Sequence, residues 1–193
     1  MQKLPKQLAK AEAEGWAHWI KSEADERAVL AGCYFDQDAA DQIVTFFEKY
    51  LFHTMGRFAG QPFTLLPWQK DDVLQPLFGW KKANGNRRFS KGDIFVAKKQ
   101  GKSTLAAGLC NFFLLTSGHR SEVYGVAHTR EQAGIIYREA AAMAKSSPQL
   151  SKVLAVRDSN KRIMYKATNS FYQAVPGEAS ARGIEGINPV AVV

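Results

Sequence analysis

"IFVAKKQGKSTLAAGLCNFFLL", residues 94–115, decides the fold of this 193-residue chain. A short β-branched and aromatic run at 94–97 is followed by Gly101, Lys102 and Ser103, and residues 102–116 are apolar on nearly every side. A buried strand, a glycine turn and a helix buried against a sheet have this pattern. Such a turn gathers backbone N–H groups in front of the positive end of the helix dipole. The stretch therefore predicts a loop that binds phosphate.

One position departs from the phosphate-loop pattern GxxxxGK[ST]. Val96 stands where that pattern has its first glycine. A β-branched side chain is poorly suited to positive φ, so we expect the strand to continue through Ala97. Lys98 and Lys99 follow at once, and at least one of them is expected to add positive charge toward the phosphates; the alternative for one of them is that it points to solvent.

The order of residue types around this loop suggests specific roles for three side chains. We hypothesise that Lys102 reaches the β- and γ-phosphates of a nucleotide, while the hydroxyl of Ser103 ligates Mg²⁺. Thr104 is the alternative metal ligand if the loop is shifted by one residue. This chemistry requires ATP or a related nucleotide together with Mg²⁺.

The residues on either side predict an α/β fold. Residues 121–127 have the character of a second buried strand, and Thr129 with Gln132 forms a capping box for the next helix. A hairpin is expected to turn at 157–160, and apolar runs follow at 171–176 and 190–193. This order is typical of a parallel sheet flanked by helices. We predict an N-terminal helical arm at 1–35 and an α/β domain at 36–193 that is incomplete at its C-terminus.

The charge is uneven along the sequence. Of 26 Lys and Arg residues, 18 lie in 81–193, where only 7 of the 18 Asp and Glu residues lie, so this part has a net charge of +11. Such an excess favours a polyanionic partner, nucleotide or nucleic acid, over a merely solvated basic face. With 46% hydrophobic residues, no leader and no bilayer-spanning apolar run, a globular, soluble, intracellular protein is expected.

A second candidate binding element lies upstream in "PFTLLPWQK", residues 62–70. A glutamine amide pairs with the donor and the acceptor on the edge of adenine, while an aromatic or proline ring packs on its face. We expect this role for Gln69, with a neighbouring ring supplied by Phe63, Pro67, Trp68 or Phe58. The alternative is a Trp anchored in the core beside a Gln on the surface.

Five segments of the sequence resemble, in their order and spacing, the ATPase half of the large terminase subunit of tailed phages. They are "GRFAGQPFTLLPWQ", "LFGW", "RRFSKGDIFVAKKQGKSTLAAG", "AHTREQA" and "GINPVAVV". The resemblance runs from about residue 35 to 193. In that family the phosphate loop often lacks its first glycine, so Val96 is tolerated. The resemblance implies a phosphate-loop ATPase that packs double-stranded DNA into procapsids in the host cytoplasm. Its implied partners are DNA, the small terminase subunit and the portal, on which it forms a homo-oligomer, and no membrane.

The resemblance also implies roles for single residues. Gln69 takes the place of the adenine reader, and Lys98 or Lys99 that of the basic residue which senses the γ-phosphate. Gln100 and Gly101 belong to the loop that holds the phosphates, in which Lys102 and Ser103 keep the roles given above. Arg182 is expected near phosphate or DNA, and a structural salt bridge is an equal alternative.

The family pattern continues past the last residue of this sequence. It places an Asp that holds Mg²⁺ and a Glu that positions water directly after a strand like "NPVAVV", and a nuclease domain further on. The sequence ends at Val193, so we expect weak Mg-ATP binding with negligible hydrolysis. Two alternatives remain open: a helicase-type ATPase, and a non-catalytic basic module that docks on DNA or the procapsid.

Overall fold

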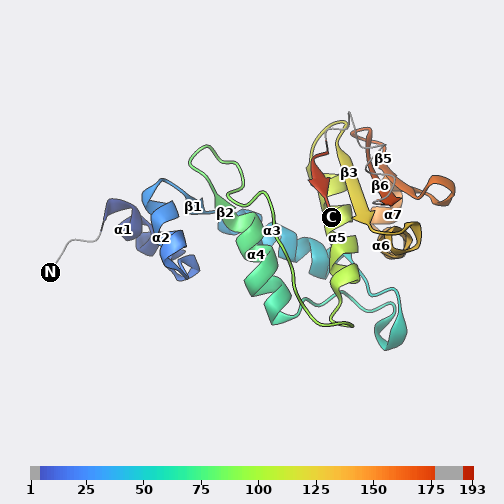
Figure 1. The fold of residues 1–193 in the computed structure, drawn as a ribbon, viewed down its shortest axis with the longest axis horizontal. Coiled ribbons are helices and arrows are strands. Elements are labelled where there is room, and N and C mark those ends of the chain that lie inside the picture. The colour runs from blue at the N-terminus through green and yellow to red at the C-terminus, as the bar shows by residue number, and fades with distance from the viewer. Residues whose placement is uncertain (1–4, 177–188) are drawn as a thin grey trace. The chain divides into compact units, whose positions relative to one another are not determined.

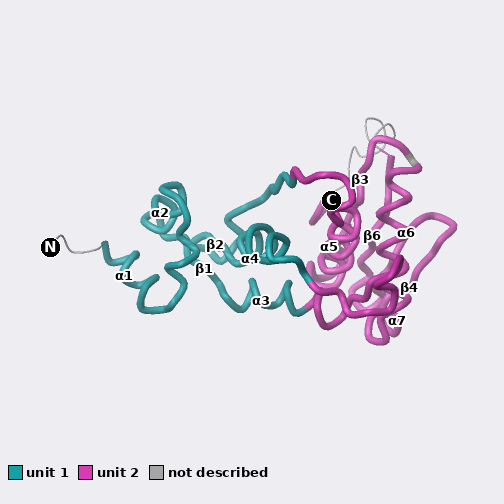
Figure 2. Tube along the Cα trace, turned by 90° about the horizontal axis from the view of Figure 1, so that it is seen from below, with its two compact units in different colours: residues 1–45, 65–94 teal, residues 46–64, 95–193 magenta. Residues whose placement is uncertain are grey.

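The computed structural model of the chain describes residues 5–176 and 189–193, with the side chain of Arg130 left out. These residues form two compact units, coloured separately in Figure 2. Unit 1 comprises Met1–Thr45 and Leu65–Ile94, and unit 2 comprises Phe46–Thr64 and Phe95–Val193. The division into an arm at 1–35 and a domain at 36–193 stays a prediction.

Unit 1 is helical with one small antiparallel strand pair. Its elements are α1 (Lys6–Ala13), η1 (Ala17–Trp19), α2 (Glu23–Leu30), β1 (Tyr34–Phe35), α3 (Gln37–Thr45), η4 (Trp68–Leu74), α4 (Gln75–Gly79) and β2 (Trp80–Lys81). Sequence signals set several of these boundaries. Ser22 accepts a hydrogen bond from the backbone N–H of Asp25 at the start of α2, and Asp36 accepts one from Ala39 at the start of α3.

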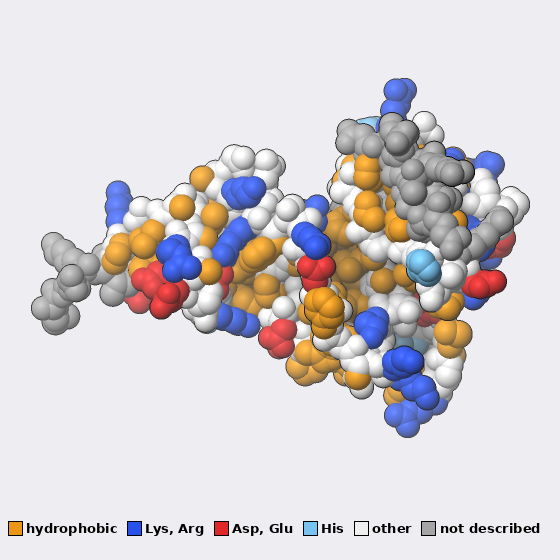
Figure 3. Space-filling model, viewed as in Figure 1, with side chains coloured by type: hydrophobic (Ala, Val, Ile, Leu, Met, Phe, Trp, Pro, Cys, Tyr) orange, Lys and Arg blue, Asp and Glu red, His pale blue; other side chains and the backbone are white. Residues whose placement is uncertain are grey.

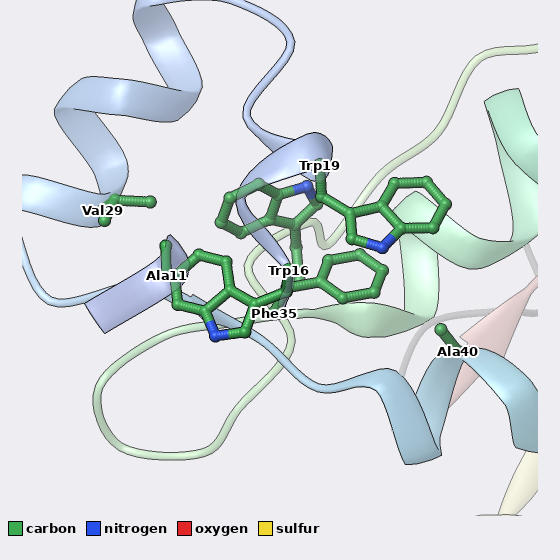
Figure 4. Packing of buried hydrophobic residues seen from close by; sticks show 7 residues of the cluster. Ala11, Trp16, Trp19, Val29, Phe35 and Ala40 are labelled. Carbon is green, nitrogen blue, oxygen red and sulfur yellow. The ribbon is translucent and has the colours of Figure 1, made fainter. Parts of the chain in front are cut away.

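Aromatic side chains hold unit 1 together. The rings of Trp19 and Phe35 stack at 4.4 Å, and Trp80 meets Phe35 edge-on at 5.7 Å. Figure 4 shows Trp16, Trp19 and Phe35 gathered among the short helices. Large rings bury enough apolar area to stabilise a unit whose helices are too short to be stable alone.

One ion pair in unit 1 is largely shielded from solvent. The Arg88 guanidinium donates to the Asp25 carboxylate at 2.6 Å, and both side chains are about 15% exposed. Burial opposes ionisation of Asp25, but hydrogen bonds from Arg88 and Ser22 and the Arg88 charge outweigh it, so its pKa lies below the ordinary value. The pair thus connects α2 to the segment after β2.

Unit 2 contains a five-stranded mixed sheet, of which β3, β5 and β6 are labelled in Figure 1. Its strand order is β4-β5-β6-β3-β7. β3 pairs in parallel with β6 and with β7, whereas β5 runs antiparallel to β4 and β6. The remaining elements are helices. In chain order unit 2 has η2 (Phe46–Tyr50), η3 (Gly56–Phe58), α5 (Lys102–Thr116), β3 (Glu122–Ala127), α6 (Arg130–Ser146), α7 (Leu150–Val153), β4 (Leu154–Arg157), η5 (Asp158–Asn160), β5 (Arg162–Tyr165), β6 (Ser170–Pro176) and β7 (Ala191–Val192).

The α/β fold class and several elements agree with the sequence predictions. Helix α5 occupies the residues predicted for it, and Thr129 caps α6 by accepting a hydrogen bond from the Gln132 N–H at 3.2 Å. The predicted hairpin is β4 and β5, turning through η5. Helices α5 and α6 lie side by side against β3 and β6. The sheet and its helices therefore form the layered arrangement that the pattern indicated.

The strand predicted at residues 94–97 is wrong. These residues adopt no strand, and the Phe95 side chain is 92% exposed. The two edges of β3 are paired with β6 and β7, and residues 94–97 do not pair with the outer edge of β7 or of β4 either. Backbone without a ladder partner does not form a strand.

Helix α5 is fixed by close packing inside unit 2. Its middle turns are buried, including Leu105, Cys110 and Leu114. Gly108 faces the Phe47 ring so closely that an added Cβ would lie 2.3 Å from Cε1 of Phe47 and 3.0 Å from Cδ1 of Leu51. A glycine inside a helix is unfavourable, and here close approach of an aromatic ring requires it.

We expect Gly108→Ala to lower the free energy of unfolding by about 1–3 kcal/mol, because overpacking a core outweighs the better helix propensity of alanine. The matched control is Gly134→Ala in α6, where the nearest atoms are the flexible ends of Lys161 and Arg138. That change is expected to be neutral or stabilising by up to about 1 kcal/mol. Urea denaturation followed by circular dichroism measures both; equal effects would contradict the packing assigned to Gly108.

Candidate phosphate-binding site

The loop before α5 turns through two residues with left-handed backbone conformation. Lys99 has φ 66° and Gly101 has φ 79°, while Val96 keeps a negative φ. Gly101 is the N-cap of α5, and the chain turns at Lys98 and Lys99. The prediction that Val96 has no positive φ is confirmed, and the first left-handed residue is Lys99, three positions later.

Backbone N–H groups are available at the end of this turn. Within the described part of the chain, the amides of Lys99, Gly101, Lys102, Ser103 and Thr104 donate to no other group, and the first helical bond here runs from Leu105 N to Gly101 O. The first turn of any helix leaves such donors, and the helix dipole adds partial positive charge. Together these groups form a site suited to an anion such as phosphate.

The Lys102 side chain folds back over the loop. Its Nζ donates to the carbonyl of Val96 at 2.5 Å and to that of Ala97 at 3.3 Å. An ammonium group has three donors, so these carbonyls use two of them. The positive charge of Lys102 is thereby held beside the amides of the same turn.

Most of the other loop side chains that were predicted to bind the nucleotide are exposed to solvent. Lys98, Lys99 and Gln100 are exposed, as is Ser103, whereas Thr104 is half-buried. The Ser103 hydroxyl is therefore more accessible to a metal than that of Thr104. Among residues 5–176 and 189–193, no three His, Cys, Asp or Glu side chains gather as metal ligands. A metal here would combine one hydroxyl with phosphate oxygens, which suits Mg²⁺.

The predicted adenine reader lies in unit 1. Gln69 is 3% exposed, and its Oε1 accepts a hydrogen bond from the Leu66 N–H at 3.0 Å. The alternative of a surface Gln is therefore wrong. Pro67, which is exposed, precedes η4, and Trp68 is half-buried in it. The bond from Leu66 fixes which way the Gln69 amide points, and a carbonyl oxygen can still accept a second bond.

Phe63 belongs to unit 2 and lies in its interior. Its side chain is 3% exposed, stacked on His53 at 4.7 Å and edge-on to Phe47 at 5.4 Å. A ring with so little exposed surface has little to offer a nucleotide base. Phe58 is 45% exposed, and the Arg57 guanidinium lies 4.7 Å from its ring centroid.

Two other sequence predictions concern Arg182 and the absence of a membrane-spanning segment. Arg182 lies outside the described residues. In the described ranges no helix is both long and apolar enough to pass through a bilayer.

Comparison with known proteins now identifies the family. The model of the terminase large subunit ATPase domain matches residues 67–188. The chain belongs to this terminase family. The match includes Pro67, Trp68, Gln69 and the whole loop before α5, while Phe63 lies before it.

Similar proteins include the terminase large subunit of Enterobacteria phage HK97, with 25% identity over 155 residues, 79% of this chain and 29% of that protein. The crystal structure of the HK97 bacteriophage large terminase shares the fold, with a TM-score of 0.63 and 24% identity over 79% of this chain and 30% of that one. The chain thus spans less than a third of the length of these terminase relatives.

Sequence reasoning missed two features of the loop. The left-handed conformation of Lys99 has no signal in the sequence, because lysine rarely adopts it. The bonds from Lys102 to the carbonyls of Val96 and Ala97 also depend on how the chain turns. The signal for the N-terminus of α5 was the glycine before an apolar run, and it was sufficient.

We expect Gly101→Ala to lower the free energy of unfolding by about 1–2 kcal/mol, since a Cβ is disfavoured at φ 79°. Gln100→Ala, at the adjacent exposed position, is the control and is expected to change it by less than about 0.5 kcal/mol. Chemical denaturation of both variants measures the difference. Equal stability of the two variants would rule out a left-handed turn at Gly101.

Proposed function

We propose that this chain binds Mg-ATP at the turn before α5, and that in a full-length terminase large subunit ATP hydrolysis there drives double-stranded DNA into procapsids. The observation that carries the proposal is the left-handed turn at Lys99 and Gly101, which leaves the amides of Gly101–Thr104 available beside the Lys102 ammonium. Membership of the terminase family supports it and favours packaging over a helicase-type function.

Each loop residue has a distinct role in this proposal. The backbone amides hold the β-phosphate, and Lys102 binds β- and γ-phosphate oxygens by charge-assisted hydrogen bonds. Lys98 or Lys99, both exposed, supplies further positive charge at the γ-phosphate. The Ser103 hydroxyl would be the protein ligand of Mg²⁺, and the metal would supply positive charge to the phosphates.

The adenine base is assigned to Gln69, with Pro67 or Trp68 against its face. The support is the fixed orientation of the Gln69 amide, held by Leu66 N–H, and the inclusion of all three residues in the family match. A buried amide with a fixed orientation discriminates between bases better than a mobile one, since mispairing leaves it unsatisfied.

Membership of the terminase family supports a proposal for partners and location. The proposed partners are double-stranded DNA, the small terminase subunit and the portal of the procapsid, with the large subunit forming a homo-oligomer on the portal in the host cytoplasm. If the chain is instead a non-catalytic docking module, its affinity for DNA is expected to be the same with and without ATP and after Lys102→Ala.

Lys102→Ala is expected to weaken binding of a non-hydrolysable Mg-ATP analogue by about 10- to 100-fold, because a charge-assisted hydrogen bond to phosphate contributes about 1.5–3 kcal/mol. Lys152→Ala on α7 removes the same charge from an exposed position and is expected to leave affinity unchanged. Isothermal titration calorimetry measures both. Binding of equal strength by the two variants would refute the loop as the phosphate site.

Gln69→Ala is expected to reduce the preference for ATP over GTP about tenfold, because the amide no longer pairs with the adenine edge. The ratio of the two affinities is the measured quantity, since a loss of stability alone lowers both equally. Gln75→Ala is the matched control: Gln75 is also buried in unit 1, at 6% exposure. If Gln75→Ala changes the ratio as much as Gln69→Ala, adenine is not read by Gln69.

A further inference from the structure

A small pocket opens on the surface of unit 1. Its volume is about 220 Å³. Sites for cofactors and drug-sized molecules usually measure about 300–1,000 Å³, so this pocket suits a single side chain better than a nucleotide. All of its lining residues belong to unit 1. Its apolar walls are Trp19, Pro76, Trp80 and Phe89, and its charged residues are Lys21, Asp25 and Asp72.

The two tryptophan walls of the pocket are fixed by the core of unit 1. The Trp19 ring stacks on Phe35 at 4.4 Å, and its Nε1 donates to Gln37 Oε1 at 3.2 Å. Trp80 meets the same Phe35 ring edge-on. Rings held by stacking and by a hydrogen bond are not free to turn into the pocket and fill it. The pocket is therefore a preformed feature of unit 1.

Cationic groups of the protein already lie against the rings of this pocket. The Nζ of Lys21 is 5.2 Å from the Trp19 ring centroid. The Arg88 guanidinium is 4.9 Å from the Trp80 ring and 4.8 Å from the Phe89 ring. The face of an aromatic ring carries partial negative charge and attracts cations. The rings of the pocket thus favour a cationic group over an anionic one.

The two carboxylates of the pocket differ in what they can still bind. Asp25 is largely shielded, and its oxygens accept from Arg88, from the Ser22 hydroxyl and from the Lys21 N–H. The Asp72 side chain is 70% exposed, and its ion pair within the described residues is a long one, 3.9 Å from Lys21 Nζ. Asp72 is therefore the carboxylate that can accept hydrogen bonds from a ligand.

Lys21 occupies the pocket only loosely. Its side chain is 52% exposed, and besides the long contact with Asp72 it donates to the Asp71 carbonyl at 3.3 Å. Exposed ion pairs of this kind contribute little to stability. A guanidinium is planar, stacks on aromatic faces and binds a carboxylate through two parallel hydrogen bonds, which an ammonium cannot do. An arginine from outside can therefore displace Lys21.

The charge of unit 1 does not oppose a basic ligand. Unit 1 contains 11 Lys and Arg residues and 11 Asp and Glu residues and is neutral, whereas unit 2 contains 15 and 7 and has a net charge of +8. Figure 3 shows acidic side chains grouped beside hydrophobic ones in the part of unit 1 that contains α1 and α2. The acidic residues nearest the pocket in sequence are Glu23, Asp25 and Glu26 in the first turn of α2, and Asp71 and Asp72 in η4.

We propose that this pocket is a docking site for an arginine side chain in a basic segment of a partner protein. The guanidinium lies against the Trp19 ring in place of the Lys21 ammonium and donates to the Asp72 carboxylate. Arginine and tryptophan are enriched among the residues that dominate protein–protein binding energy, and they do so in small desolvated pockets such as this one. The site is distinct from the loop before α5, and it does not depend on nucleotide binding.

The test is a titration of the ¹⁵N-labelled 193-residue chain with blocked glycine peptides that contain one central Arg, Lys or Leu. Peptide concentrations up to about 10 mM are needed, because a single side-chain contact gives affinities near the millimolar range. The Arg peptide is expected to shift the indole N–H signals of Trp19 and Trp80, and to bind more tightly than the Lys or Leu peptide. The signal of Trp68, which does not line the pocket, is the internal reference.

Three variants locate the binding to the pocket. Asp72→Asn is expected to weaken binding of the Arg peptide by about two- to fivefold, because the accepting carboxylate is lost. Lys21→Met keeps the apolar stem and removes the competing ammonium, so affinity is expected to rise by about two- to fivefold. Asp71→Asn removes the same charge from the adjacent exposed residue, which does not line the pocket, and is the matched control with unchanged affinity.

Several outcomes would overturn the docking site. Equal weakening by Asp71→Asn and Asp72→Asn, or equal binding of the Arg and Lys peptides, would reduce the effect to general charge attraction. Tighter binding of the Leu peptide would make the pocket an apolar one. Absence of indole shifts over the whole titration would leave no site, and the same shifts on concentrating the chain without peptide would assign the pocket to a second copy. Lys102→Ala is expected to bind the Arg peptide normally, so failure of this proposal and failure of the ATP site are separate results.

Discussion

The burial of helix α5 is the constraint on which the candidate site depends. Gly108 lets the Phe47 ring approach the helix backbone, and Leu105 and Leu114 are buried on either side of it along the helix. A helix packed this closely cannot shift along its axis without opening cavities or clashes. Its first turn, and with it the free amides after Gly101, is therefore held in position by the core.

Most of the fold around this helix could be predicted from the sequence, because capping and turn residues stand next to the apolar runs that become buried. The apolar run after Gly101 gave α5, and Thr129 before an apolar stripe gave the start of α6. The hairpin turn at 157–160 was likewise marked by polar residues between two strands. The failure at residues 94–97 has a different origin, since these residues have strand character but pair with no strand of the described sheet.

The sequence predicted which residues form the candidate site but not the backbone conformation of the loop. The sequence named Gly101, Lys102 and Ser103, but the second left-handed residue is Lys99, whose identity gives no such signal. The opposed arginines of the hairpin, Arg157 and Arg162, could not be predicted from the sequence, because register decides whether two residues five positions apart across a turn face each other. The charge excess predicted an anionic partner, and the structure places all of the net excess in unit 2.

Lys102 shows how such a loop holds a charge ready for phosphate. Its ammonium is bonded to two neutral backbone carbonyls, each of which has a second acceptor position and is within reach of water. A phosphate oxygen carries a larger negative charge than a carbonyl oxygen, so an ammonium group is attracted more strongly to phosphate than to these carbonyls. The carbonyls before the turn therefore position Lys102 without competing strongly for it. A carboxylate in the same place would hold the lysine too tightly, and no acidic side chain lies between Asp93 and Glu122 in the sequence.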